Sequence, residues 1–151
     1  MLLLHCHKIL LQIKVSQGKL PSNAHEFLKV WKNVLRTPAD RYSFVLRIGS
    51  QQLGRIFCSE ISFGLLGEMI GVLNGEYSDA DGRELVAILE ALSSVNRFSL
   101  SLQFLDKTEH AACSQLLQQL HQTFVEHVDD ETETLPQFAD RVVSLMSVYS
   151  V

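Results

Sequence analysis

Hydrophobic residues recur every three or four positions in successive stretches of this chain, and short polar breaks separate the stretches. This period is that of an amphipathic helix, whose apolar stripe faces a core. The stretches cover residues 24–36, 38–48, 62–73, 78–95, 107–127 and 136–149. The pattern predicts an all-α protein, a compact bundle of about six or seven short helices with an extra C-terminal amphipathic helix.

Residues at the ends of these stretches support the predicted helices. Asn23 and Glu26, and likewise Asp106 and Glu109, have the spacing of a capping box, in which two side chains satisfy free amides of the first helical turn. Gly49 is expected to end the second helix, because glycine often terminates helices. We expect one helical domain over residues 20–127.

The longest apolar stretch, Leu53–Leu73, predicts a short helix, a corner and a second helix. Ser62 is expected to cap the second helix, which is apolar on almost every side and should therefore lie at the centre of the bundle. Gly67 and Gly71 interrupt this helix, and each costs roughly 1 kcal/mol relative to alanine. Two explanations stay open: close approach of a neighbouring helix, which is the simpler one, and a flat groove for a partner.

Residues 98–105 present conflicting signals. Phe98, Leu100, Leu102 and Phe104 alternate with polar residues, which is the period of a strand. A lone strand would leave its backbone groups unpaired, and no second strand is predicted nearby. We therefore expect a short helix here.

Two segments flank the predicted domain. Residues 1–19 form a poorly defined N-terminal extension, whose apolar run is broken by histidines and a lysine and does not fit a signal peptide. Residues 128–134 read as an acidic linker, and residues 135–151 as an amphipathic helix. Its apolar stripe, Phe138, Val142, Leu145 and Tyr149, must dock on something, because so short a helix is marginal in water. We favour docking on its own domain over a partner's groove.

Composition excludes several classes of protein. A net charge of −4 over 151 residues argues against nucleic-acid binding, which usually needs a basic surface. No run of roughly 20 apolar residues predicts a membrane span. Three cysteines without paired spacing argue against a disulfide framework and favour a reducing cytoplasm.

Candidate chemistry points away from an enzyme. His110 and Cys113 lie three residues apart but match no metal-binding motif, and no catalytic or cofactor-binding set can be assembled. Arginine is enriched where partners bind, so Arg47, Arg55 and Arg97 are candidate partner contacts. The remaining candidate contacts are Trp31, Gly67, Gly71, Phe138, Val142, Leu145 and Tyr149.

Four groups of residues resemble a known family. They are Pro21…Glu26-Phe27…Trp31-Lys32, Tyr42…Leu46-Arg47-Ile48, Leu53…Ile56-Phe57 and Val95…Arg97-Phe98. Over roughly residues 20–127 the chain resembles the C-terminal domain of RNA-polymerase-II-associated protein 3. The resemblance implies an all-helical, non-enzymatic adaptor, which in the parent protein engages the RuvB-like AAA+ ATPases of a co-chaperone complex.

Further residues resemble the branch of this family that serves axonemal dynein arms: Gly54–Phe57, Phe63–Glu68, Asn96–Leu100 and the closing Leu145…Tyr149-Ser-Val151. This resemblance implies an adaptor in assembly or axonemal attachment of dynein arms, in the cytoplasm and in the axoneme of cilia or flagella. The implied partners are axonemal dynein assembly components, RuvB-like ATPases or axonemal microtubules, with self-association left open. That branch has a charged helical N-terminal region, whereas residues 1–19 show no heptads, which suggests an isoform-specific start or a partial gene model.

Overall fold

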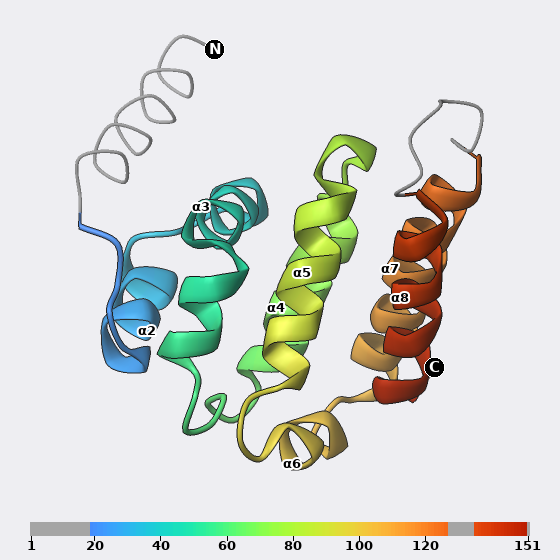
Figure 1. Cartoon of the computed structure of the whole chain (residues 1–151). Coiled ribbons are helices and arrows are strands. Elements are labelled where there is room, and N and C mark those ends of the chain that lie inside the picture. Colours follow the sequence, from blue (N-terminus) through green and yellow to red (C-terminus); the bar gives the residue numbers. More distant parts are fainter. Residues whose placement is uncertain (1–18, 127–134, 151) are drawn as a thin grey trace, which may run out of the picture.

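The computed structural model describes residues 19–126 and 135–150, and within these residues it contains helices and no strand (Figure 1). The prediction of an all-α bundle is therefore confirmed. The elements are α2 (Ala24–Asn33), α3 (Pro38–Ile56), α4 (Leu65–Gly75), the 3-10 helix η1 (Asp79–Asp81), α5 (Gly82–Ser93), α6 (Phe98–Gln103), α7 (Lys107–Glu126) and α8 (Leu135–Val148).

Helix α5 stands in the middle of the bundle (Figure 1), where it packs against α3 on one side and against α7 and α8 on the other. Its apolar residues Leu85, Val86, Ile88, Leu89 and Leu92 are all buried. Helix α4 lies behind it and packs against α7 and α3, while α6 crosses one end of the bundle. Helix α5 therefore contacts three of the other helices, α3, α7 and α8.

The expected central position of residues 65–73 is wrong. One side of α4 is buried against α3 and α7, but Glu68, Gly71 and Gly75 on this helix are exposed. The apolar composition of α4 suggested cover on all sides. Two of the exposed positions are the glycines Gly71 and Gly75, which have no side chain that would need to be buried.

Of the two predicted capping boxes, the one at Asp106 is complete and the one at Asn23 is formed only in part. Asn23 accepts from the amide of Glu26 at 2.9 Å, although the Glu26 carboxylate accepts from Ser22 rather than from Asn23 itself. At the start of α7 the pair is reciprocal, with Asp106 accepting from Glu109 at 2.8 Å and Glu109 accepting from Asp106 at 2.9 Å. These local signals were readable from sequence because they involve neighbours along the chain.

Gly49 interrupts α3, as expected, with φ +80° and ψ +165°. Helical backbone resumes directly after it, so α3 is bent rather than ended. The amide of Ser50, freed by the bend, donates to the Glu84 carboxylate of α5 at 3.1 Å. The bend therefore joins α3 to the central helix.

Two predicted helix starts are wrong. The side chain of Ser62 does not cap α4, which begins after Gly64 at φ +78°, and only the Ser62 carbonyl takes part, by accepting from the amide of Leu65. Helix α5 begins at Gly82 instead of residues 78 or 79, because residues 79–81 form η1. In both places a tight turn precedes the helix, and its geometry depends on packing that the sequence pattern does not report.

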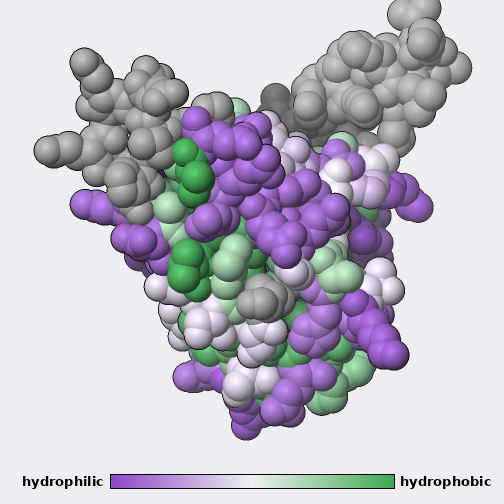
Figure 2. Space-filling view, turned by 90° about the vertical axis from the view of Figure 1, so that its right-hand side faces the viewer, coloured by the Kyte–Doolittle hydropathy of each residue, from purple (hydrophilic) through white to green (hydrophobic). Residues whose placement is uncertain are grey.

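The C-terminal helix α8 packs against α7 and α5, as the sequence analysis favoured. Val142, Leu145 and Tyr149 are buried, and Phe138 stacks on Phe124 of α7 with ring centroids 5.0 Å apart. Arg141 of α8 also pairs with Glu90 of α5. The outer side of the α7–α8 pair is largely hydrophilic, with small scattered apolar patches (Figure 2). The acidic linker and residues 1–18 lie outside the described residues.

Candidate interaction surface

Helix α6 has apolar residues on two faces, and this explains its alternating sequence. Phe98 and Leu102, one helical turn apart, pack into the core, and Phe98 contacts the ring of Tyr149 edge-on at 5.0 Å. Leu100 and Phe104, also one turn apart, point outward and are 46% and 50% exposed. Since residues four apart share a helix face, strict alternation over the seven residues 98–104 yields one buried and one exposed apolar stripe.

The loop between α3 and α4 lies beside this exposed stripe. Its Ile61 is buried and fixes the loop to the core, whereas the next aromatic residue, Phe63, is 81% exposed. Gly64, with its positive φ, then turns the chain into α4 and leaves the Phe63 side chain outside the bundle. The amide of Asn96 donates to the carbonyl of Cys58 at 3.3 Å, which ties the loop to the turn before α6.

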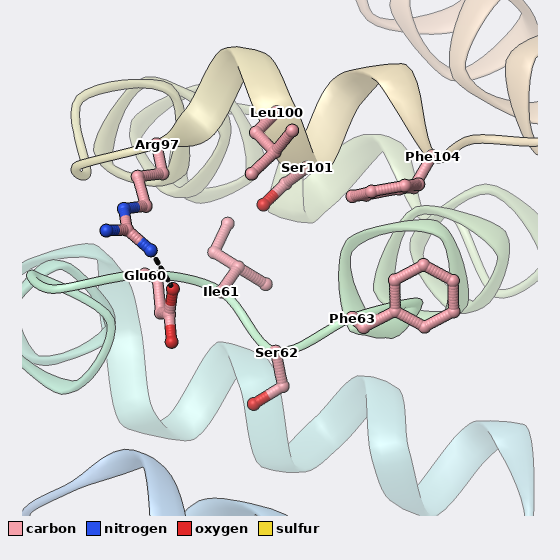
Figure 3. A pocket seen from close by; sticks show the side chains of 8 residues that line it. All are labelled: Glu60, Ile61, Ser62, Phe63, Arg97, Leu100, Ser101 and Phe104. Carbon is pink, nitrogen blue, oxygen red and sulfur yellow. Dashed lines mark hydrogen bonds and ion pairs between the residues drawn. The ribbon is translucent and has the colours of Figure 1, made fainter.

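Phe63 and Phe104 meet edge to face, with ring centroids 4.7 Å apart. Together with Leu100 they surround a hollow of about 190 Å³, whose other lining residues are Glu60, Ile61, Ser62, Arg97 and Ser101. Figure 3 shows the two rings at one end of this hollow and Glu60 with Arg97 at the other. We refer to Phe63, Leu100 and Phe104 as the apolar triad.

An exposed ion pair lies at the end of the hollow opposite the two aromatic rings. Arg97 donates from Nη1 to Oε2 of Glu60 at 3.2 Å, and the two side chains are 69% and 59% exposed. Arg97 has φ +59°, a left-handed conformation that is uncommon outside glycine, asparagine and aspartate. Water screens such a pair, so it stabilises the fold little and remains available to a partner.

Of the residues that the sequence analysis named as partner contacts, Arg97 lines the hollow. Trp31 is buried, its indole nitrogen donates to Glu68 at 2.9 Å, and Arg41 stacks over its ring. Arg47 and Arg55 lie exposed on α3, away from the lining of the hollow.

The two glycines of α4 differ. A Cβ at Gly67 would overlap the carboxyl group of Glu109, so the space beside this glycine is occupied by a side chain from α7. A Cβ at Gly71 would meet nothing within 4 Å, and the residue is exposed. Close packing therefore does not account for Gly71.

The apolar stripe of α8 is turned toward the core. Val142, Leu145 and Tyr149 are buried and Phe138 is partly buried, so these side chains are covered by α5 and α7 in this structure. The guanidinium carbons of Arg141 and Arg83 also lie over the Phe138 ring, 4.5 and 5.5 Å from its centroid.

Sequence reasoning missed Glu60 and the apolar triad. One signal could have found part of it: Leu100 and Phe104 are four residues apart but out of step with Phe98 and Leu102. If residues 98–104 form a helix, they carry two apolar faces. A helix that packs on the core with one side needs only one of them. Phe63 has no such signal, because its exposure follows from the turn at Gly64.

The arrangement has the chemistry of a binding surface. Its exposed rings and aliphatic side chain can bury an apolar group, and its ion pair can exchange partners. Within the described residues, no group of three or more histidine, cysteine, aspartate or glutamate side chains is placed to hold a metal ion. None of the described helices has the length and apolar character needed to cross a membrane.

Known proteins resemble this chain in sequence and in fold. A family model described as "Potential Monad-binding region of RPAP3" matches residues 20–110, a range that includes the hollow. The solved C-terminal domain of human RPAP3 superposes with a TM-score of 0.62 over 83% of this chain and 90% of that domain, at 14% identity. At that identity the likeness shows the shared fold alone.

Relatives named dynein axonemal assembly factor 19 are similar over two thirds or more of this chain. The mouse (Mus musculus) protein is 34% identical over 66% of this chain and 42% of its own length. The Xenopus tropicalis protein is 30% identical over 87% of this chain and 56% of its own length. The chain thus spans about half the length of these relatives. Because the family model matches more than half of its residues, the chain belongs to the family of the RPAP3 C-terminal domain.

Proposed function

We propose that this chain is a non-enzymatic adaptor in the assembly or axonemal attachment of dynein arms, and that the apolar triad is where it binds a protein partner. The similarity to relatives named dynein axonemal assembly factor 19 supports a role in the assembly of dynein arms. The observation that carries the site is the exposure of Phe63, Leu100 and Phe104 around one hollow. Large apolar side chains that gather on a surface and do not contribute to the core mark interaction sites.

A second candidate function is a co-chaperone adaptor that docks on RuvB-like AAA+ ATPases. The family description as a potential Monad-binding region, and the resemblance to an adaptor domain of a co-chaperone complex, favour it. The same surface would serve either function, so the identity of the bound protein decides between them.

The test is affinity capture from extracts of ciliated cells with the whole chain, followed by quantitative mass spectrometry. A triple variant, Phe63→Ser, Leu100→Ser and Phe104→Ser, removes the apolar triad. The matched control replaces three valines that are 48%, 52% and 46% exposed elsewhere, as Val125→Ser, Val143→Ser and Val148→Ser. Exposed substitutions usually change the free energy of unfolding by about 0.5 kcal/mol or less, so both variants should fold.

We expect axonemal dynein chains or dynein assembly factors on the wild type and the control, and their loss from the triad variant. Direct binding of purified RuvB-like ATPases, without enrichment of dynein components, would favour the co-chaperone function instead. Equal capture by the wild type and the triad variant would show that the partner binds elsewhere. Cilium-related localisation predicts in addition that a tagged chain is found in the cytoplasm and axoneme of ciliated cells.

A further inference from the structure

We propose that the hollow binds a short partner segment in which a bulky apolar residue and an acidic residue lie close together in sequence. The inference rests on the proposed function, since it takes the apolar triad as the docking surface. It adds the chemistry of the partner: the apolar side chain enters between Phe63, Leu100 and Phe104, and the carboxylate binds Arg97.

The size of the hollow fits one side chain. Its volume is about 190 Å³, and the buried Ile61, which is 5% exposed, is among the residues that line it. A leucine or phenylalanine side chain fills such a space, whereas the broad face of a helix does not enter it. Its burial would remove the exposed surface of the apolar triad from water, which is favourable.

The charged end supplies more donors than its present partner uses. The guanidinium of Arg97 has five N–H donors in a planar fork that suits a carboxylate. Within the described residues Glu60 takes one of these nitrogens, Nη1, at 3.2 Å. A second carboxylate can therefore bind the remaining donors, or displace Glu60 from a pair that water already weakens.

The surroundings of Arg97 favour an acidic partner over a basic one. Ser59 and Asn96 line a second hollow with Glu60 and Arg97, directly beyond the first. The Ser59 hydroxyl, the Asn96 amide and the Arg97 guanidinium can all donate to a carboxylate of the partner. A basic group of the partner could pair with one carboxylate among these lining residues, that of Glu60. The apolar and anionic parts of the partner would then lie in adjoining hollows that share Glu60 and Arg97.

The loop backbone can add hydrogen bonds to an extended segment. Glu60, Ile61 and Ser62 belong to no helix, and Figure 3 shows their trace running along the hollow. In the part of the chain that the structure describes, their three amides donate to no protein acceptor. A partner segment lying beside this loop could accept from them, which is how extended peptides gain affinity in many complexes.

The test starts from a phage-displayed library of random short peptides, selected on the whole chain. We expect the enriched peptides to share an aromatic residue or leucine with an aspartate or glutamate nearby. The strongest binder is then synthesised with and without its acid replaced by the corresponding amide. Calorimetry should show binding weakened about tenfold, the factor that ~1.4 kcal/mol gives.

Variants of the ion pair give effects of opposite sign. Arg97→Gln should weaken peptide binding by about the same factor. Glu60→Gln should tighten it, because it frees the Arg97 donors and removes a negative charge beside the incoming acid. A Glu76→Gln variant is the matched control, since Glu76 is an exposed acid at the end of α4 that does not line the hollow.

Two results would overturn the inference while leaving the proposed function intact. One is an enriched set of peptides without an acid, or weaker binding by the Glu60→Gln variant. The other is no enrichment at all when the triad variant still loses its cellular partner, because the surface would then recognise a folded face. Capture of cellular partners by the triad variant would reject the docking surface, and this inference with it.

Discussion

The hydroxyl of Tyr149 donates to the backbone carbonyl of Leu89 at 2.8 Å, in a bond buried between the C-terminal end of α8 and the middle of α5. The Tyr149 side chain is fully buried and its ring also contacts Phe98 of α6 edge-on. One residue near the end of the chain therefore contacts both the central helix and α6, which carries Leu100 and is followed directly by Phe104 of the apolar triad.

Tyr149→Phe should lower the free energy of unfolding by about 0.5–1.5 kcal/mol, the usual contribution of one hydrogen bond. The ring and its contacts stay, so the cost should be well below the 3–5 kcal/mol typical of deleting a buried aromatic side chain. Urea unfolding measures the difference. Val148→Ala, at a neighbouring exposed position, is the control and should leave stability nearly unchanged.

Removing residues 135–151 should lower the melting temperature strongly. Val142, Leu145 and Tyr149 are buried against the bundle, and burial of such side chains contributes roughly 1.5–3 kcal/mol each. The surfaces of α5 and α7 that they cover would become exposed, so binding of a hydrophobic dye should increase. An unchanged melting temperature in the shortened chain would contradict the packing of α8 on the bundle.

The two glycines of α4 should respond oppositely to alanine. Gly67→Ala places a methyl group against the Glu109 carboxylate, which must then move and lose its hydrogen bond to the amide of Asp106. We expect net destabilisation. Gly71→Ala meets nothing within 4 Å, so the higher helix propensity of alanine should stabilise the protein by up to ~1 kcal/mol.

The cause of the Gly67 effect can be isolated with Glu109→Ala. In that background the obstructing carboxylate is gone, and Gly67→Ala should become stabilising, as we expect for Gly71→Ala. Thermal unfolding of the four combinations measures the coupling between the two positions. A Gly67→Ala effect that does not depend on residue 109 would show that some other contact limits this site.

Stability should fall as the solution becomes alkaline. Burial raises the pKa of the Cys113 thiol from its ordinary value of 9.0 to about 11. Between these two values the unfolded chain has lost this proton while the folded chain keeps it. The free energy of unfolding then decreases with pH, at up to ~1.4 kcal/mol per pH unit.

Unfolding in urea at several pH values across this window measures the slope. Cys113→Ala should make the slope shallower, although it also lowers stability at every pH by removing a buried group. Burial raises the pKa of Tyr149 as well, so a decline of the same sign remains and Tyr149→Phe should reduce it further. If neither variant changes how the free energy of unfolding depends on pH, the loss of stability at alkaline pH must come from other titratable groups.

The sequence by itself determined the helical fold and several of the positions at which helices begin or break. The helix-capping residues Asn23 and Asp106 and the break at Gly49 were predictable, because each depends on neighbours along the chain or on a backbone preference of one residue. The stripe of α8 was also predictable as a docking face, since a short amphipathic helix is stable only when its apolar side is covered.

Tertiary structure decided which apolar residues were left outside. The sequence shows Phe98, Leu100, Leu102 and Phe104 as equivalent, yet the core accepts two and leaves two exposed, because a helix six residues long presents one face to it. The neighbour of that exposed face, Phe63, comes from 37 residues before Leu100 and is oriented by the turn at Gly64. Periodicity records which positions are apolar, whereas the packing of α6 against the α3–α4 loop determines which of them meet at the surface.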